Sequence, residues 1–301
     1  MKIVFLLSVL GLALAGPQIK ISSGEKVMPK EAIDYINSQQ SKWTASDEWV
    51  ADMTIEEAKR FANAEIRIRE FPERNWGSLI EYTSVPTNFD SRQKWPNCIH
   101  PILNQGQCGS CWAFGATEAL SDRLCIDSNG SVNEVLSPQY LVSCDYGSYG
   151  CDGGWPDQAW SFMRENGVAT NKCVPYEARD GTCPSSCSDG SPIKLYHADS
   201  VNTYSGPSSI QMAILEGGPV ETAFTVYQDF MSYKGGIYEH TYGKYLGGHA
   251  VKIIGWGYEQ NTHYWLVANS WGTSWGLQGF FKIAFGQCGI DNQAVAGKAR
   301  V

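Results

Sequence analysis

The sequence predicts an α+β protein in which a mostly helical half is joined to a mostly β half. Its 301 residues, 43% of them hydrophobic, are enough to bury a sizeable core in one or two domains. Residues 109–166 contain three helix-like apolar patterns, whereas residues 195–285 alternate apolar and polar side chains between glycine-rich turns. Neither half contains an internal repeat or a low-complexity tract.

The first fifteen residues are typical of a signal peptide. Lys2 precedes an almost unbroken apolar stretch from Ile3 to Leu14, and Ala13-Leu-Ala15 matches an A-x-A cleavage site. This stretch is too short to span a bilayer, and no later segment is apolar over the required length. The sequence therefore predicts entry into the secretory pathway, where cysteines are expected mostly as disulfides.

The charge distribution argues against a nucleic-acid-binding protein. The net charge is −8, and the basic residues are scattered, with no group denser than Arg67-Ile-Arg69. A surface that follows a phosphate backbone needs clustered positive charge. We expect an acidic, soluble, secreted protein without nucleic-acid or membrane partners.

Residues 16–84 differ from the rest of the chain because all ten cysteines lie in residues 85–301. Thr54-Ile-Glu-Glu57 fits a capping box and predicts a short amphipathic helix. Its apolar face would hold Ile55, Ala58, Phe61 and Ala62. Two interpretations remain open for this part of the chain, a small ordinary subdomain and a removable pro-segment.

The first predicted helix of the cysteine-rich part covers Cys111–Cys125, and the others cover Ser137–Val142 and Trp155–Glu165. Ser110 suits the N-cap of the first helix, so Cys111 would lie in its first turn. The positive end of the helix dipole makes a thiol easier to ionise there, and the thiolate is the reactive form.

The motif QGQCGSCWAF, from Gln105 to Phe114, holds a C-x-x-C formed by Cys108 and Cys111. A disulfide oxidoreductase would use both thiols and predicts a thioredoxin-like βαβ setting. A zinc site has the least support, because no second cysteine or histidine pair occurs at ligand spacing. The third interpretation is one disulfide cysteine beside one reactive cysteine.

A cysteine that cleaves amides needs a histidine, held by a third group, to protonate the leaving amine. His249 begins an alternating strand in LGGHAVKIIGWGYE, and Asn269 ends the next strand in THYWLVANSWG. If the turn centres on Glu259, these two residues become cross-strand partners, and the Asn269 amide oxygen would orient the imidazole. The remaining histidines are interpreted as structural: His100, His197, His240 and His263.

Gln105 and Asn269 each have an ordinary interpretation as well. Gln105 would be either a surface glutamine or an N–H donor to a developing oxyanion, alongside the backbone N–H of Cys111. Asn269, before Ser-Trp-Gly, would either orient His249 or shape a turn.

Three motifs in this order, QGQCGSCWAF, GGHAVKIIGWG and WLVANSWGTSWG, resemble those of papain-like cysteine proteases over residues 85–301. The resemblance implies a two-domain fold with a mostly helical left domain, a β-barrel-like right domain and an active-site cleft between them. It implies these roles: Cys111 as nucleophile, His249 as acid/base, Asn269 as orienter, Gln105 as oxyanion donor, Trp271 as a shield over the Asn–His bond, and Gly153 and Gly154 as backbone partners of substrate.

Within the family, VPTNFDSRQKWPNC, CDGGWPDQAW and GGPVETAFTVYQDF resemble cathepsin B-type members. That likeness implies a zymogen with a signal peptide at 1–15, a short pro-segment at 16–84 cleaved near Ser84-Val85, and a mature domain at 85–301. It also implies the disulfides Cys98–Cys125, Cys108–Cys151, Cys144–Cys183 and Cys173–Cys187, with Cys111 reactive and Cys288 a buried inert thiol.

Two departures from the cathepsin B pattern change the expected specificity. Only nine residues without a histidine separate Cys173 from Cys183, where cathepsin B carries its histidine-bearing occluding loop. We therefore expect an endopeptidase with little carboxydipeptidase activity. At the pocket position where cathepsin B carries a Glu, this chain has Gln293, unless the match shifts to Asp291. Trp155, Pro156, Ala223 and Ala250 would complete a substrate site that prefers apolar P2 residues.

The same likeness implies the partners and location of the protein. We expect peptide and protein substrates, the protein's own pro-segment and cystatin-like proteins as inhibitors, a monomeric state, and no cofactor or metal. The expected location is the secretory pathway, ending in lysosome-like or vacuolar vesicles or outside the cell. Asn129-Gly-Ser131 is a candidate glycosylation site. A catalytically silent peptide-binding relative is the remaining alternative, although all four site residues are present.

Overall fold

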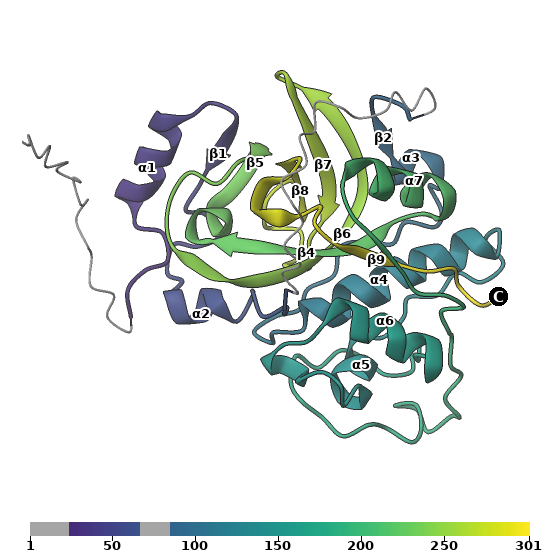
Figure 1. Ribbon diagram of the computed structural model, residues 1–301. Coiled ribbons are helices and arrows are strands. Elements are labelled where there is room, and N and C mark those ends of the chain that lie inside the picture. The colour runs from purple at the N-terminus through teal and green to yellow at the C-terminus, as the bar shows by residue number, and fades with distance from the viewer. Residues whose placement is uncertain (1–23, 67–84) are drawn as a thin grey trace, which may run out of the picture.

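The computed structural model describes residues 24–66 and 85–301. The expected signal peptide and the expected cleavage point near Ser84-Val85 lie outside these residues, except for Val85 itself. Figure 1 shows helices α4, α5 and α6 gathered on one side of a large sheet, so the predicted helical half and β half are both present. The N-terminal segment, defined here as residues 24–66, lies along the sheet half and reaches toward the helices.

The three helices predicted for residues 109–166 are confirmed almost to the residue. They are α4 (Cys111–Asp127), α5 (Pro138–Cys144) and α6 (Pro156–Glu165). Helix α4 is buried from Cys111 to Cys125, so its apolar residues are spread around the helix and do not form one stripe. Two smaller elements, β2 (Phe89–Asp90) and α3 (Ser91–Lys94), precede it.

One helix was missed in the stretch predicted to contain strands, namely α7 (Pro207–Gly217). Its start is marked by Gly206 at φ 80° and by Pro207 in the first turn, and Ile210, Ala213 and Ile214 are buried at helical spacing. The strand prediction for residues 195–285 was therefore wrong here, because these apolar residues follow the i, i+3, i+4 period of a helix and not the alternation of a strand.

Within the described residues, the strands form one nine-stranded mixed sheet in the order β1-β5-β8-β7-β6-β4-β9-β3, with β2 pairing β6 outside this path. All pairings are antiparallel except that of β5 with β8. The strands are β1 (Trp43–Ala45), β3 (Asn202–Tyr204), β4 (Val220–Tyr227), β5 (Tyr233–Tyr238), β6 (Tyr245–Glu259), β7 (Thr262–Ala268), β8 (Phe280–Ala284) and β9 (Ala294–Ala296).

The register predicted for the β6–β7 hairpin is wrong. Gln260 and Asn261 both have positive φ and form a two-residue turn, so Glu259 pairs with Thr262 and is not the centre of the turn. An irregularity between Ile253 and Gly255 shifts the pairing once more along the strand. Asn269 therefore lies just beyond β7 and is not a cross-strand partner of His249, whose partner is Phe224 on β4.

A buried ion cluster joins the two halves of the fold. Lys252 on β6 places Nζ 2.7 Å from Asp122 Oδ2 and 3.8 Å from Glu118 Oε2, both on α4. Burial alone would lower the pKa of Lys252, but the two carboxylates more than offset it and raise this pKa. The cluster fixes helix α4 against strand β6. Since α4 begins with Cys111 and β6 contains His249, it also fixes the elements that carry these two residues.

The N-terminal segment is part of the packed molecule. It contributes α1 (Lys30–Gln39), β1 on the edge of the sheet beside β5, and α2 (Ile55–Lys59). The predicted capping box at Thr54 and Glu57 is confirmed. All four predicted apolar residues are buried, although α2 ends at Lys59, so Phe61 and Ala62 belong to the stretch that follows it.

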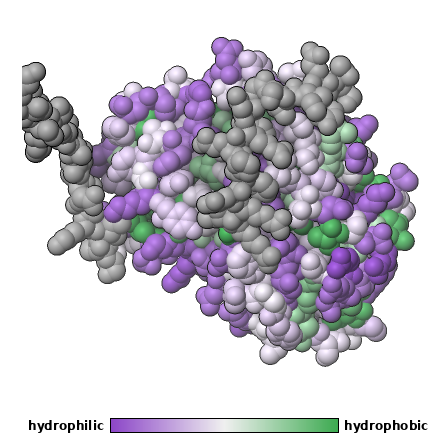
Figure 2. Space-filling model, viewed as in Figure 1, coloured by the Kyte–Doolittle hydropathy of each residue, from purple (hydrophilic) through white to green (hydrophobic). Residues whose placement is uncertain are grey.

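The face shown in Figure 2 is largely hydrophilic, and its hydrophobic residues are spread in small groups. Within residues 24–66 and 85–301, no helix combines the length and the apolar character needed to cross a bilayer.

Candidate active site

Cys111 is the first residue of α4 and is completely buried. Ser110 occupies the N-cap position, as predicted, but its hydroxyl makes no capping hydrogen bond. That hydroxyl instead lies 2.6 Å from the hydroxyl of Tyr176. The predicted position of Cys111 at the helix start is therefore confirmed, whereas the reason given for it, a serine cap, is wrong.

His249 and Asn269 are in contact despite the shifted register. His249 Nε2 lies 2.7 Å from Asn269 Oδ1, which also accepts a hydrogen bond from the backbone N–H of Ser270 at 2.8 Å. An amide oxygen only accepts, so Nε2 carries the proton and Nδ1 is the basic nitrogen. Among the described residues Nδ1 has no hydrogen-bond partner. This tautomer leaves Nδ1 available to take a proton.

Trp271 covers the His249–Asn269 bond, in the position expected of it. Its ring stacks on the imidazole of His249 with centroids 4.6 Å apart, and only 1% of Trp271 is exposed. Water is thereby kept from the hydrogen bond, which strengthens it in the less polar surroundings.

Gln105 is completely buried, so its interpretation as a surface residue is wrong. Its Oε1 accepts a hydrogen bond from Ser270 Oγ at 2.7 Å, and its Nε2 donates to the carbonyl oxygen of Cys108 at 3.0 Å. Nε2 carries two protons, so one remains for an incoming oxygen atom. Ser270 thus links Gln105 to Asn269, a connection that the spacing of the motifs did not reveal.

The strand that carries His249 passes directly beside the Cys111 thiol. Ala250 packs against Cys111 and Ala64 in a small apolar cluster, and its backbone N–H is directed at the sulfur. The backbone N–H of Asn63, from the N-terminal segment, is directed at the same atom.

The thiol and the imidazole are both neutral in this arrangement. Burial raises the pKa of Cys111 to about 11, and the N–H groups of Ala250, Asn63 and Trp112 offset this effect only in part. Burial likewise lowers the pKa of His249 to about 4, against a smaller opposite effect of the Asn269 hydrogen bond. At pH 6 the pair therefore carries no charge.

The N-terminal segment passes between the helical half and the β half directly over this pair. Ala64 N donates to Gly248 O at 2.8 Å, and Glu65 N donates to Gly154 O at 2.9 Å. A side chain on Gly153 would collide with the carbonyl oxygen of Asn63, and one on Gly248 with that of Ala64. These glycines therefore admit an extended backbone, the role expected of Gly153 and Gly154 toward a substrate.

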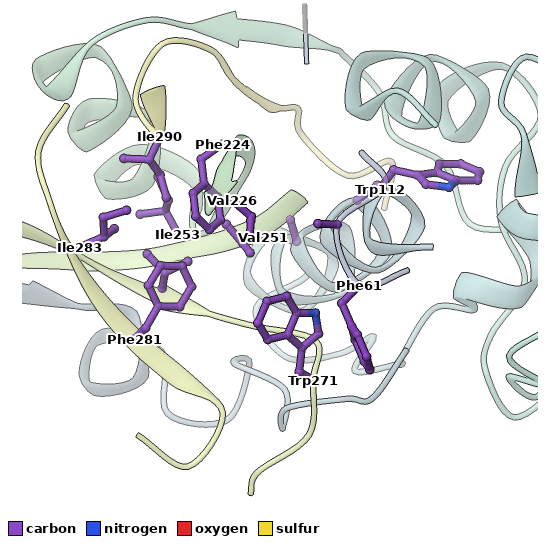
Figure 3. Packing of buried hydrophobic residues seen from close by; sticks show 14 of the residues in the cluster. Phe61, Trp112, Phe224, Val226, Val251, Ile253, Trp271, Phe281, Ile283 and Ile290 are labelled. Atoms are coloured by element: carbon purple, nitrogen blue, oxygen red, sulfur yellow. The ribbon is translucent and has the colours of Figure 1, made fainter. Parts of the chain in front are cut away.

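Aromatic side chains of the same segment cover the back of the site. Trp49 stacks on Trp271 with centroids 5.3 Å apart and planes 8° apart, and Phe61 meets Trp271 edge-on at 5.7 Å. Figure 3 shows Phe61 beside Trp271. These contacts, which involve the ring that shields His249, were not predicted from the sequence.

A cavity of about 250 Å³ opens beside the site. Its wall includes three of the predicted residues, Pro156, Ala223 and Gln293, together with Glu65 and Ile66 of the N-terminal segment. Asp291 is not in the wall; its Oδ2 accepts hydrogen bonds from Trp265 Nε1 and Gly286 N inside the protein. Of the two alternatives, the neutral Gln293 is therefore the one that lines the cavity, whose wall also includes Asp157 in the first turn of α6.

Two further predictions about this wall, and one about Cys288, need correction. Ala250 packs against Cys111 and not in the wall of the cavity. Trp155 is half-buried at the start of α6 and is also outside the wall. Cys288 was expected to be buried, yet it is partly exposed and lines the cavity. Burial still raises the pKa of this thiol to about 12, so it stays protonated.

All four predicted disulfides are present: Cys98–Cys125, Cys108–Cys151, Cys144–Cys183 and Cys173–Cys187. Cys108 is thus bonded outside the C-x-x-C motif, while Cys111 is free. A dithiol oxidoreductase needs both cysteines of the motif, so this interpretation loses its support. Cys111 is therefore the only free thiol of the motif.

Comparison with known proteins agrees with this geometry. The family described as "Papain family cysteine protease" matches residues 85–298. The chain is 42% identical to the "Gut-specific cysteine proteinase" of Caenorhabditis elegans over 100% of both chains. It is 43% identical to "Cathepsin B-like CP3" of Giardia intestinalis, over 72% of this chain and 76% of that protein.

A solved structure, "proCathepsin B S9 from Trypanosoma congolense", superposes with a TM-score of 0.84 at 33% identity, covering 92% of this chain and 100% of that one. That protein is named as a proform, and the papain-like arrangement of helices and mixed sheet is shared along nearly the whole chain. The chain therefore belongs to the papain family of cysteine proteases, among its cathepsin B-like members.

Proposed function

We propose that the protein is a cysteine endopeptidase made as a secreted zymogen, in which residues 16–84 form the pro-segment. The observation that carries this proposal is the course of residues 63–65 across the buried Cys111 thiol, with backbone hydrogen bonds to both sides. An extended chain bound there would present a peptide carbonyl to the sulfur. The pro-segment would therefore block the site by occupying the place of a substrate.

Once the pro-segment leaves, water and substrate reach the pair and His249 Nδ1 takes the proton of Cys111. The thiolate attacks the carbonyl carbon, and the oxyanion is stabilised by the free proton of Gln105 Nε2 and the backbone N–H of Cys111. The imidazolium then gives its proton to the leaving amine. Water attacks the thioester, with Nδ1 again accepting a proton, and frees the acid. Asn269 holds the ring in the required orientation throughout.

The short loop after Cys173 supports an endopeptidase. It is held down on the helical half: Arg179 O accepts from Gln139 Nε2 at 2.9 Å, and Asp180 Oδ1 accepts from Cys151 N at 2.8 Å. No histidine in the loop is available to bind a terminal carboxylate. We expect an internally quenched peptide, blocked at its C-terminus, to be cleaved at least about tenfold faster than a C-terminal dipeptide is removed from a matched free peptide. Similar rates for both would contradict this expectation.

The cavity beside the site is the proposed P2 pocket. A neutral Gln293 cannot form a charge-assisted pair with an arginine, so Leu, Val or Phe should be preferred over Arg at P2. Gln293→Glu should raise kcat/KM for an Arg-P2 substrate about tenfold, because a hydrogen bond between charged groups contributes about 1.5–3 kcal/mol. Fluorogenic dipeptide substrates that differ only at P2 measure this.

A matched control for that substitution is Gln260→Glu, which adds the same charge at the exposed β6–β7 turn. It should leave the ratio of Arg to Leu cleavage unchanged. If Gln293→Glu also leaves this ratio unchanged, or if the unaltered enzyme already prefers Arg, the pocket is assigned incorrectly.

The remaining biology follows from the same proposal. Peptides and proteins would be the substrates, cystatin-like proteins the external inhibitors, and a monomer the working form. The protein would act outside the cell or in lysosome-like or vacuolar vesicles. Asn129 is exposed in the turn after α4, which suits glycosylation in the secretory pathway.

A further inference from the structure

Tyr176 lies in the short loop between Cys173 and Cys183, and its side chain points to the active-site helix. The residue is half-buried, and its ring meets Phe114 of α4 edge-on with centroids 4.7 Å apart. Both ends of the loop are held by disulfides: Cys144–Cys183 ties one end to α5, and Cys173–Cys187 ties the other end to the segment that follows the loop. The ring is thus held on the first turn of the helix that begins with Cys111.

The hydroxyl of Tyr176 joins two parts of the site. It donates to the backbone carbonyl oxygen of Gln105 at 2.8 Å and lies 2.6 Å from Ser110 Oγ. Tyr176 has one hydroxyl proton, and a carbonyl oxygen can only accept, so Ser110 must be the donor in the second bond. The two hydrogen bonds therefore point in the same direction: Ser110 donates to Tyr176, and Tyr176 donates to the carbonyl oxygen of Gln105.

This arrangement explains why Ser110 does not cap α4. Its hydroxyl points to Tyr176, and the side chain makes no capping bond to the first turn. An N-cap serine normally accepts from the N–H groups of that turn and neutralises part of the positive helix end. Holding Ser110 away keeps the N–H groups of this helix end available to an oxyanion.

Gln105 is fixed from the other side by different partners. Ser270 Oγ donates to Gln105 Oε1, and the backbone N–H of Gln105 donates to Ser270 O at 2.8 Å. Gln105 Nε2 donates to Cys108 O. The peptide that follows Gln105 is held at both of its polar groups: Gly106 N donates to Asn104 Oδ1 at 2.9 Å, and without Tyr176 the Gln105 carbonyl oxygen would lose its own bond. Tyr176 thereby holds Gln105 and the start of α4, the two sources of oxyanion donors, at a constant separation.

We propose that Tyr176 is a positioning residue of the oxyanion site, acting through Gln105 and Ser110. This inference rests on the proposed peptidase function. It requires no contact between Tyr176 and the substrate, so the residue should affect the rate of the chemical step and not the binding of peptide.

Tyr176→Phe, made in the full chain and assayed after release of the pro-segment, tests the inference because it keeps the ring and removes only the hydroxyl. We expect kcat for a peptide amide to fall about fivefold with KM changed less than twofold. Alkylation of Cys111 by iodoacetamide forms no oxyanion, so its rate should change less than twofold. Tyr146→Phe, at a residue that is 85% exposed, is the matched control and should equal the unaltered enzyme.

A second variant tests the bond chain from its other end. Ser110→Ala removes the donor to Tyr176 and should lower kcat about twofold at constant KM. The double variant should be no slower than Tyr176→Phe alone, since both changes disrupt one chain of hydrogen bonds. Ser110→Ala also gives a result if Tyr176→Phe fails to fold.

Three outcomes would overturn the inference: an unchanged kcat in Tyr176→Phe, a rise in KM alone, or a parallel loss of peptidase and alkylation rates. The last would indicate a general loosening of the site. If the unaltered released enzyme cleaves no peptide, the proposed function itself fails. If the unaltered enzyme is active and Tyr176→Phe is equally active, only the inference about Tyr176 fails.

Discussion

Replacing Cys111 by alanine should lower kcat for peptide cleavage by about 10⁴-fold or more. In nucleophile–histidine enzymes the nucleophile and the base act as one unit, so the loss of the nucleophile removes almost the whole effect of the pair. The oxyanion donors would remain, because Gln105 is held by Ser270 and Cys108 and not by the Cys111 side chain. Hydrolysis of a quenched peptide by the released enzyme measures the loss.

Cys288→Ser is the matched control for that prediction, since Cys288 is the other free cysteine among the described residues. It lies in the wall of the proposed P2 pocket, so any effect should fall on KM, with kcat changed less than about threefold. A Cys111→Ala enzyme that keeps more than a few per cent of the parent kcat would contradict the assignment of the nucleophile.

Release of the N-terminal segment should raise the reactivity of Cys111 at pH 6 by at least about 10³-fold. In the covered state the thiol has a pKa of about 11, so only about one thiol in 10⁵ is ionised at this pH. A thiol at a helix start beside an imidazolium has a pKa of about 3.5–7.5, which leaves at least about 3% ionised. The exposed His249 regains its proton for the same reason, because burial is what lowers its pKa to about 4.

The two states should also differ in their dependence on pH. Below a pKa of about 11, alkylation of the covered thiol should accelerate about tenfold per pH unit as the thiolate fraction rises. In the released enzyme the rate should be nearly flat above its lower pKa. Stopped-flow alkylation between pH 5 and pH 9 distinguishes these profiles.

Trp49→Ala in the full chain offers an intermediate case. It removes the stack on Trp271 but keeps the backbone hydrogen bonds of Ala64 and Glu65, so reactivity should rise without reaching that of the released enzyme. Equal alkylation rates in the intact and released chains would show that the segment does not protect the thiol.

Local signals in the sequence predicted the parts of the site that depend on few residues. The start of α4 at Cys111 follows from its apolar run, and the family motifs supplied the disulfide pairs and the neutral Gln293. The contact between His249 and Asn269 was predicted correctly from a wrong register. The real register depends on the positive φ angles of Gln260 and Asn261 and on an irregularity inside β6, which periodicity does not encode.

Other parts of the site required the folded chain. Tyr176 meets Gln105 and Ser110 across 71 and 66 positions of sequence, and Trp49 meets Trp271 from the far end of the chain. No helix or strand period connects such residues, because their contacts follow from how whole elements pack. The partial exposure of Cys288 in the cavity wall is a consequence of the same packing.

The most direct test of the central claim is to treat the released enzyme with an irreversible peptidyl epoxide and to locate the modified residue by mass spectrometry without reduction. We expect one adduct on Cys111, complete loss of peptidase activity, and Cys108 still joined to Cys151. A Cys108–Cys111 disulfide in the active protein, or inactivation with the adduct on any residue other than Cys111, would contradict the account.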